Sequence, residues 1–159
     1  MRDAYFFISS LNEELIRKII KNVIEDPTMF NGINVFDIQI KNTPQFEPIE
    51  SFFMASPVLL KLREGEKTRH VTLKDNDFEQ DLTDNLKRKL EKVGLSSAGI
   101  EIRLNPDFNY RNTKMVDYKG IKNRTSFAPI IIKGTQEQIA FAWNVGLGNS
   151  TGIGFGALK

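Results

Sequence analysis

Residues 78–104 read FEQDLTDNLKRKLEKVGLSSAGIEIRL, and this stretch decides the fold class. The apolar side chains at its start recur every three or four residues, which is the spacing of one helical face, at Phe78, Leu82, Leu86, Leu90 and Val93. Acidic residues come early in this segment and basic residues late, which suits the helix dipole, and Gly94 ends it. Residues 100–104 then alternate between apolar and polar side chains. The stretch therefore predicts a helix followed by a strand.

The neighbouring segments extend this pattern to the order β-α-β-β-α-β, which is that of a ferredoxin-like domain. Residues 58–63 and 69–73 predict a hairpin around the turn Glu64-Gly65-Glu66. The elements expected after the strand are a long hairpin of residues 114–121 and 126–133 that turns through Asn123, a helix of residues 135–145, and a last strand of residues 155–158. We therefore predict an α+β fold, with a ferredoxin-like domain over residues 55–159.

The first forty residues predict a shorter unit of β-α-β order. Its expected elements are a strand of residues 4–9, a helix of residues 13–25 capped by Asn12, and a strand of residues 33–41. Pro44 and Pro48 then interrupt the pattern as a linker would. Residues 1–54 are therefore expected to form a partial ferredoxin-like domain ahead of the complete one.

Composition excludes several kinds of site. The chain has 159 residues, of which 40% are hydrophobic and 26% charged, values typical of a soluble globular protein. It has no cysteine, which excludes disulfides and thiolate metal sites and fits the reducing cytoplasm, where we expect the protein. A single histidine, His70, cannot build a histidine metal site or a histidine pair for acid–base catalysis. We therefore expect no metal and no cofactor. No apolar run approaches the length of a membrane span, so we also expect no membrane partner.

Positive charge is concentrated in one stretch, although the net charge is only +2. Residues 111–133 hold six bases and one acid, so this stretch carries +5 and the rest of the chain −3. Aromatic residues lie among them, and bases that neutralise phosphates beside rings that stack on nucleobases are typical of RNA-binding surfaces. The candidates for RNA binding here are Lys114, Lys119, Lys122, Arg124 and Lys133. A solvated hairpin face with its aromatic side chains in the core would give the same pattern.

A glycine-rich segment lies at the carboxy-terminal end, GLGNSTGIGFG over residues 146–156. It holds five of the eleven glycines of the chain, and glycine allows positive φ and close approach to another surface. No Gly-Lys-Ser/Thr ends it as in a phosphate-binding Walker loop, and no strand precedes it as in a dinucleotide fingerprint. The candidates for backbone contact with a ligand are Gly146, Gly148, Asn149, Ser150, Thr151, Gly152, Gly154 and Gly156. A tight turn into an edge strand is the alternative.

This segment, which ends Gly154-Phe155-Gly156, resembles the signature of the CRISPR-associated repeat-RNA endoribonucleases of the RAMP superfamily. Earlier segments are also similar to parts of that family, namely Ser56-Pro57-Val58 to the strand that opens its second domain, residues 78–90 to the next helix, and residues 118–134 to its central hairpin. The resemblance implies two ferredoxin-like domains that bind precursor CRISPR RNA for antiviral defence. It also implies metal-independent cleavage within each repeat, by attack of a ribose hydroxyl on the adjacent phosphate, with a histidine of the first domain as acid or base.

The chain departs from the family pattern near its beginning. Its opening residues resemble only the second half of the family's first domain, and His70 matches a strand of the second domain rather than the catalytic position. The resemblance therefore carries over RNA binding and no catalytic residue, and the chain looks like an amino-terminally truncated or partial member. It could be a fragment, a diverged protein or one half of a split protein.

Two other functions remain open. A non-catalytic RAMP subunit would hold guide RNA in an interference complex with other CRISPR-associated proteins. An unrelated ferredoxin-like module would bind a small ligand or a protein partner. Binding of RNA in preference to nucleotides separates the first of these from the second.

Overall fold

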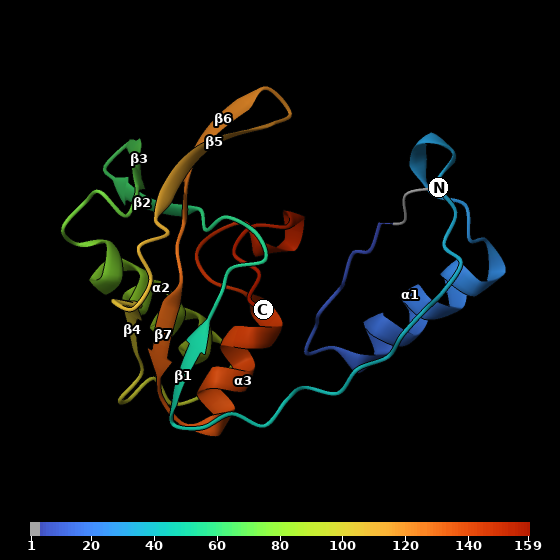
Figure 1. Ribbon diagram of the computed structural model, residues 1–159, viewed down its shortest axis with the longest axis horizontal. Helices are drawn as coiled ribbons and strands as arrows, with labels where there is room; N and C mark the ends of the chain where they lie inside the picture. The colour runs from blue at the N-terminus through green and yellow to red at the C-terminus, as the bar shows by residue number, and fades with distance from the viewer. Residues whose placement is uncertain (1–3) are drawn as a thin grey trace. The chain divides into compact units, whose positions relative to one another are not determined.

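The computed structural model describes residues 4–159, which belong to two compact units (Figure 1). One unit ends at Thr43, and the other spans Pro44–Lys159. The second unit combines two α-helices with antiparallel sheets, so the predicted α+β class is confirmed. Among the described residues, every helix falls short of the length and apolar content that a membrane crossing needs.

A three-stranded sheet forms the centre of the second unit. Strand β7 (Ile130–Lys133) lies in the middle and pairs antiparallel with β1 (Ile49–Phe52) on one side and β4 (Glu101–Leu104) on the other. Ile130 and Ile132 alternate with half-exposed or exposed neighbours along β7 and are fully buried. Ile130 and Ile132 therefore lie on the same face of the sheet, and this face packs into the core.

Two helices supply the rest of the core. Helix α2 (Phe78–Lys92) matches the predicted helix and buries the expected apolar residues Phe78, Leu82, Leu86 and Leu90. Helix α3 (Gln136–Val145) begins after Thr135, which accepts a hydrogen bond from the Gln138 N–H, while Gln138 accepts one from the Thr135 N–H. This reciprocal capping box fixes the start of α3 where the sequence predicts it.

Two hairpins extend from these layers (Figure 1). Strands β2 (Leu60–Glu64) and β3 (Lys67–Val71) pair around Gly65, as predicted. Strands β5 (Asn112–Tyr118) and β6 (Ile121–Phe127) pair around Lys119-Gly120, whose φ values of 51° and 79° give the positive-φ pair that a two-residue hairpin turn favours.

The predicted turn through Asn123 is therefore wrong, because Asn123 lies within β6 and pairs with Val116. The second hairpin is also shorter than predicted. It ends at Phe127, and Ala128-Pro129 separates it from β7, which joins the central sheet. Pro129 has no N–H for a strand ladder and so favours this break. The predicted last strand over residues 155–158 is reduced to a bridge between Leu158 and Met54.

The first unit contains the predicted helix but neither predicted strand. Helix α1 (Glu13–Glu25) begins after Asn12, whose side chain accepts a hydrogen bond from the Leu15 N–H at 3.0 Å, as expected for its cap. Residues 4–9 form no strand, and residues 33–41 contribute only an isolated bridge from Asn34 to Thr28, beside the short 3-10 helix Phe30–Gly32. Strands need a partner for their backbone groups, and no ladder with another described segment supplies one.

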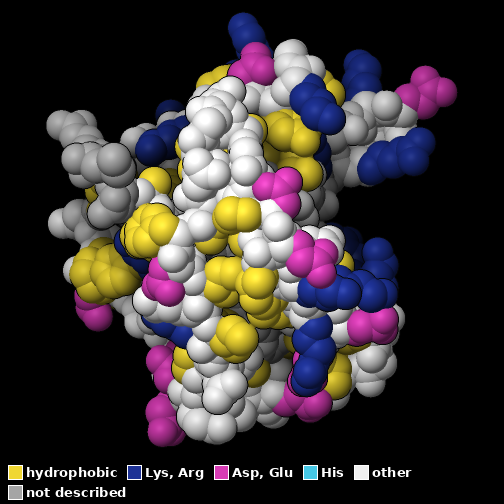
Figure 2. Space-filling model, turned by 90° about the vertical axis from the view of Figure 1, so that its right-hand side faces the viewer, with side chains coloured by type: hydrophobic (Ala, Val, Ile, Leu, Met, Phe, Trp, Pro, Cys, Tyr) yellow, Lys and Arg dark blue, Asp and Glu magenta, His cyan; other side chains and the backbone are white. Residues whose placement is uncertain are grey.

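Apolar side chains of the first unit are exposed. Tyr5, Phe36 and Ile40 are 93%, 80% and 75% exposed, and α1 buries no residue. Figure 2 shows hydrophobic side chains gathered near the centre of one face of the molecule, with lysine, arginine and acidic side chains around them. The core of the described structure therefore lies in the second unit, where all the buried apolar residues are found.

Candidate nucleic-acid interface

The glycine-rich segment forms a loop that follows α3 and folds back on itself. The Leu147 N–H donates to the Gly156 carbonyl at 2.9 Å, which closes the loop at its base. The Gly156 N–H donates to the Pro57 carbonyl at 2.9 Å, which ties that base to the residues before β2. Leu147 is fully buried and anchors the loop in the core. We call residues 146–156 the glycine loop.

Asn149 joins the glycine loop to the edge of β2. Its N–H donates to the Leu59 carbonyl at 2.6 Å, and its side-chain oxygen accepts a hydrogen bond from the Lys61 N–H at 2.7 Å. The loop therefore continues the hydrogen bonding of β2 where no neighbouring strand does so. This role explains Asn149 without a ligand, because both of these polar groups are used within the chain.

The glycines of the loop divide into two groups. Gly146, Gly148 and Gly156 are buried with positive φ, and a Cβ on any of them would overlap backbone atoms of the chain itself. Gly152 and Gly154 are exposed, and nothing lies within 4 Å of the position that a Cβ would take. The first group is therefore required because the backbone of the chain packs closely against these three glycines. The exposed tip, Ser150–Gly154, is the part that faces solvent.

A basic cleft of about 620 Å³ lies beside the glycine loop. Its walls come from β2, α2 and the loop, and its charged residues are Lys61, Arg63, Glu64, Arg88, Lys89 and Lys92. Glu64, the only acid in this lining, already forms an ion pair with Arg69 at 2.7 Å. Five bases therefore face a cleft whose single carboxylate is engaged elsewhere, which makes the cleft suited to a polyanion.

The contribution of α2 to this cleft is not predicted from the sequence, because the helix dipole alone accounts for the bases near the carboxy-terminal end of that helix. Arg88 and Lys92 are four residues apart and therefore lie on one helical face. That spacing was the available signal. Asn85 also lines the cleft, and its buried side-chain oxygen has no hydrogen-bond partner among the described residues.

Lys89 holds the base of the glycine loop. Its ammonium group donates to the Gly146 carbonyl at 2.9 Å, at the carboxy-terminal end of α3. The last turn of α3 has no base of its own, so Lys89 supplies the positive charge that the helix dipole favours there. Burial lowers the pKa of this amine from 10.5 to about 8.

The basic hairpin β5–β6 brings four of the predicted bases together. Lys114 lies 5.4 Å from the centre of the Phe127 ring, and Lys119 lies 5.6 Å from that of Tyr118. Lys122 and Arg124 are exposed on β6. The hairpin therefore combines cations with aromatic rings, as its sequence predicts.

Lys133 and His70 lie elsewhere. Lys133 ends β7, in the central sheet, so it is not grouped with the hairpin bases. His70 is half-buried on β3 and pairs with Lys61, as expected for a strand residue. Burial, followed by the charges of Lys61 and Arg124, lowers the pKa of His70 below its usual 6.5.

The model of the family described as CRISPR associated protein Cas6, C-terminal, matches residues 39–159, which is most of the chain. The chain belongs to this Cas6 family. The CRISPR-associated endoribonuclease Cas6 1 of Methanocaldococcus jannaschii is 26% identical over 158 residues, which cover 96% of this chain and 62% of that relative.

Solved structures agree with the assignment to the Cas6 family. The product of a Cas6-related gene from Pyrococcus furiosus is similar with a TM-score of 0.77 and 25% identity, covering 95% of this chain and 65% of that chain. A RAMP protein that binds different RNA substrates matches with the same TM-score, identity and coverage. The chain thus spans roughly two thirds or less of the length of these relatives, 62% of the first and 65% of the two solved structures.

Proposed function

We propose that this chain binds CRISPR repeat RNA and provides an RNA-binding surface of a metal-independent endoribonuclease that processes precursor CRISPR RNA. The observation that carries the proposal is the basic cleft, in which five bases line the walls together with Ser150 and Thr151 of the glycine loop. Membership of the Cas6 family makes repeat RNA the polyanion to test first.

The binding surface consists of two parts. The cleft attracts phosphates through Arg63, Arg88 and Lys92, which are exposed, while Gly152 and Gly154 at the tip of the loop leave room for the RNA backbone. The basic hairpin β5–β6 supplies further phosphate contacts. Its rings offer stacking surfaces for unpaired bases.

We extend the proposal to the architecture. The elements from β2 to α3 represent a ferredoxin-like domain of residues 55–159, in which the β2–β3 hairpin lies before α2. Strand β1 precedes this domain in the sequence and pairs with β7 at the edge of its sheet. Residues 1–54 represent part of a second such domain. The observed order of two strands, helix, strand, hairpin, strand and helix supports this assignment.

A second candidate function is retention of guide RNA without cleavage. The specific observation in its favour is the position of His70, the only histidine, in the middle of β3 with its pKa lowered. A half-buried ring in the middle of a strand, whose charged form is disfavoured by burial and by nearby cations, is poorly placed to serve as the acid and base of RNA cleavage. This function needs the same binding surface and differs only in the outcome of a cleavage assay.

The test measures the affinity of the full chain for a fluorescently labelled repeat RNA at several salt concentrations. We expect the triple variant Arg63→Gln, Arg88→Gln, Lys92→Gln to bind weakly and to reduce the salt slope by roughly 2 units, since each lost phosphate contact removes about 0.7. The matched control changes three exposed bases of α1, Arg17→Gln, Lys18→Gln and Lys21→Gln, and is expected to retain most of the affinity. An equal loss of RNA affinity in both variants would show that only the net charge of the protein matters, and would overturn the role of the cleft.

A further inference from the structure

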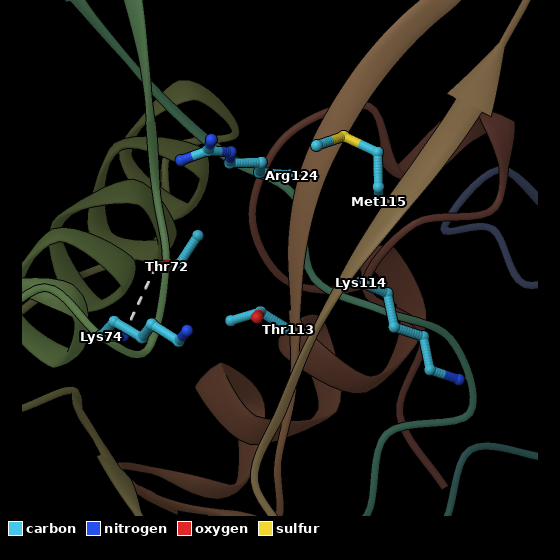
Figure 3. A pocket seen from close by; sticks show the side chains of 6 residues that line it. All are labelled: Thr72, Lys74, Thr113, Lys114, Met115 and Arg124. Carbon is cyan, nitrogen blue, oxygen red and sulfur yellow. Dashed lines mark hydrogen bonds between the residues drawn. The ribbon is translucent and has the colours of Figure 1, made fainter.

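A second, smaller depression shares no lining residue with the basic cleft. It has a volume of about 280 Å³ and lies between the end of β3 and the basic hairpin β5–β6. Its lining residues are Thr72, Lys74, Thr113, Lys114, Met115 and Arg124 (Figure 3). None of them is acidic. We call this depression the β3–β5 pocket.

The strand pattern decides which side chains enter the pocket. Thr113 and Met115 are two residues apart on β5 and share a face, and Met115 pairs with Arg124 across the hairpin. Figure 3 shows Thr113 and Lys74 pointing towards one another across the gap, with Arg124 reaching from β6 towards β3. Lys114 points away in the same view, consistent with its place over the Phe127 ring. The interior is therefore formed by the other five residues.

The charge of the pocket is positive, and its two interior cations, Lys74 and Arg124, form no direct ion pair with any of residues 4–159. The nearby carboxylate, Asp75, is engaged by the Thr72 N–H at 2.8 Å, by the Thr72 hydroxyl at 3.0 Å and by Arg69 at 3.5 Å. The hydrogen bond of the Thr72 N–H, that of the Thr72 hydroxyl and the charges of Arg69 and Arg124 lower the pKa of Asp75, so its charge is stabilised where it is. Two cations thus remain available to an anion.

Met115 adds an apolar surface to this polar site. Its side chain is 55% exposed on a hairpin whose other pocket-facing residues are hydroxyl-bearing or charged. Figure 3 shows its thioether beside Arg124. In that view the thioether faces the aliphatic part of Arg124, and the guanidinium reaches on towards β3. A polarisable thioether and a guanidinium in one pocket can both contact an aromatic ring, because methionine is polarisable and arginine attracts π-systems.

We propose that the β3–β5 pocket binds a single unpaired nucleotide of the RNA. Lys74 contacts its phosphate, Thr113 its ribose, and the Met115–Arg124 surface its base. The volume is near the lower end of small-ligand sites, roughly 300–1,000 Å³, which suits one nucleotide and is too small for a paired stem. This inference rests on the proposed RNA binding and names the place where a base leaves the strand to be read or held.

The test uses the methionine methyl groups as reporters in the full chain. The four methionines are Met1, Met29, Met54 and Met115, and Met54 is buried at 2% exposure in the core. With ¹³C-methyl methionine, we expect adenosine monophosphate to move the Met115 signal upfield, because a stacked ring shields the methyl, while the Met54 signal stays in place. Ribose 5-phosphate and inorganic phosphate, which lack the ring, are expected to leave the Met115 signal almost unmoved. A short repeat RNA should reproduce the shift seen with adenosine monophosphate.

Variants separate the pocket from the rest of the hairpin. Met115→Ala is expected to weaken binding of adenosine monophosphate by about fivefold or more, the lower end of what a stacked base contributes. Ile121→Ala, which removes an equally exposed apolar side chain at the turn of the same hairpin, is the matched control and should bind as the parent does. Lys74→Gln should weaken binding of both adenosine monophosphate and ribose 5-phosphate.

The outcomes distinguish this inference from the proposed function. If the chain binds repeat RNA while the Met115 methyl stays unmoved by RNA and by adenosine monophosphate, the pocket assignment is wrong and the RNA-binding function stands. If the chain binds no RNA, both are overturned. Equal effects of Met115→Ala and Ile121→Ala on nucleotide binding would also overturn the pocket, because stacking would then be spread over the hairpin.

Discussion

At the scale of single residues, glycines of one motif serve different purposes. Gly156 is buried at φ 68°, and a Cβ there would overlap the Leu147 carbonyl, whereas Gly152 is exposed with open space around it. We expect Gly156→Ala to lower the free energy of unfolding by about 2 kcal/mol or more, since the left-handed conformation alone costs an alanine about 1–2 kcal/mol. Gly152→Ala should change it by less than about 0.5 kcal/mol. Urea unfolding of the two variants measures the difference, and equal midpoints would contradict it.

The lowered pKa of Lys89 predicts how the free energy of unfolding depends on pH. Its folded pKa of about 8 lies below its unfolded value near 10.5, so between these pH values the unfolded chain binds more protons. Stability should therefore rise as pH increases from about 8 to about 10, and this gain is lost again as pH falls from about 10 to about 8. Lys89→Met removes the titrating group, and its unfolding free energy should lack this rise. Parallel pH profiles for the parent and Lys89→Met would show that the amine is not desolvated.

The sequence predicts the position of the glycine loop but not the reason for each residue in it. Clustered glycines indicate close approach, yet the approaching partner of Gly148 is the backbone of Leu59, which is nearly ninety positions earlier. A long-range contact of this kind leaves no local pattern. The same limit explains why the bases of α2 were not assigned to the cleft, since the opposite wall comes from β2 and the loop.

At the scale of elements, the basic hairpin β5–β6 acts as one electrostatic unit. We expect Lys122→Gln to flatten the salt dependence of RNA affinity by about 0.7 units, the value for one phosphate contact on a single strand. Lys133→Gln removes the same charge from β7, at the end of that strand away from the hairpin, and should leave the slope unchanged. Binding titrations between low and moderate salt measure both slopes. A similar loss of slope in Lys133→Gln would extend the RNA path onto the central sheet.

Helices and short turns could be predicted at this scale, whereas strands without partners could not. Helix α2 follows from its apolar stripe and α3 from its capping box, because both signals are local. Residues 4–9 are also apolar but form no strand. A strand forms only when a second strand pairs with it, and the apolar pattern of a segment does not specify that second strand. The hairpin turns at Lys119-Gly120 rather than at Asn123, because two consecutive residues there adopt positive φ.

At the scale of the whole molecule, binding and cleavage should separate. The full chain is expected to bind repeat RNA without cleaving it efficiently, because its only histidine lies half-buried within β3. Denaturing gels of labelled repeat RNA, with chelator present, measure cleavage beside the binding curve. Rapid cleavage would place an acid–base group in this chain, and its disappearance in His70→Ala would identify that group.

The pairing of the two ends of the second unit has a consequence for how the protein is made. Phe53 exchanges two backbone hydrogen bonds with Lys159, and the Gly156 N–H reaches the Pro57 carbonyl, so segments about 100 residues apart close the unit together. During synthesis, the residues around Val58 and Leu59, which are buried in the finished fold, emerge long before the glycine loop that covers them. Closing so long a connection is slow compared with forming α2 or the β2–β3 hairpin. This apolar edge therefore stays uncovered in the growing polypeptide until residues 146–156 have been made, and exposed apolar surface of this kind favours aggregation during folding.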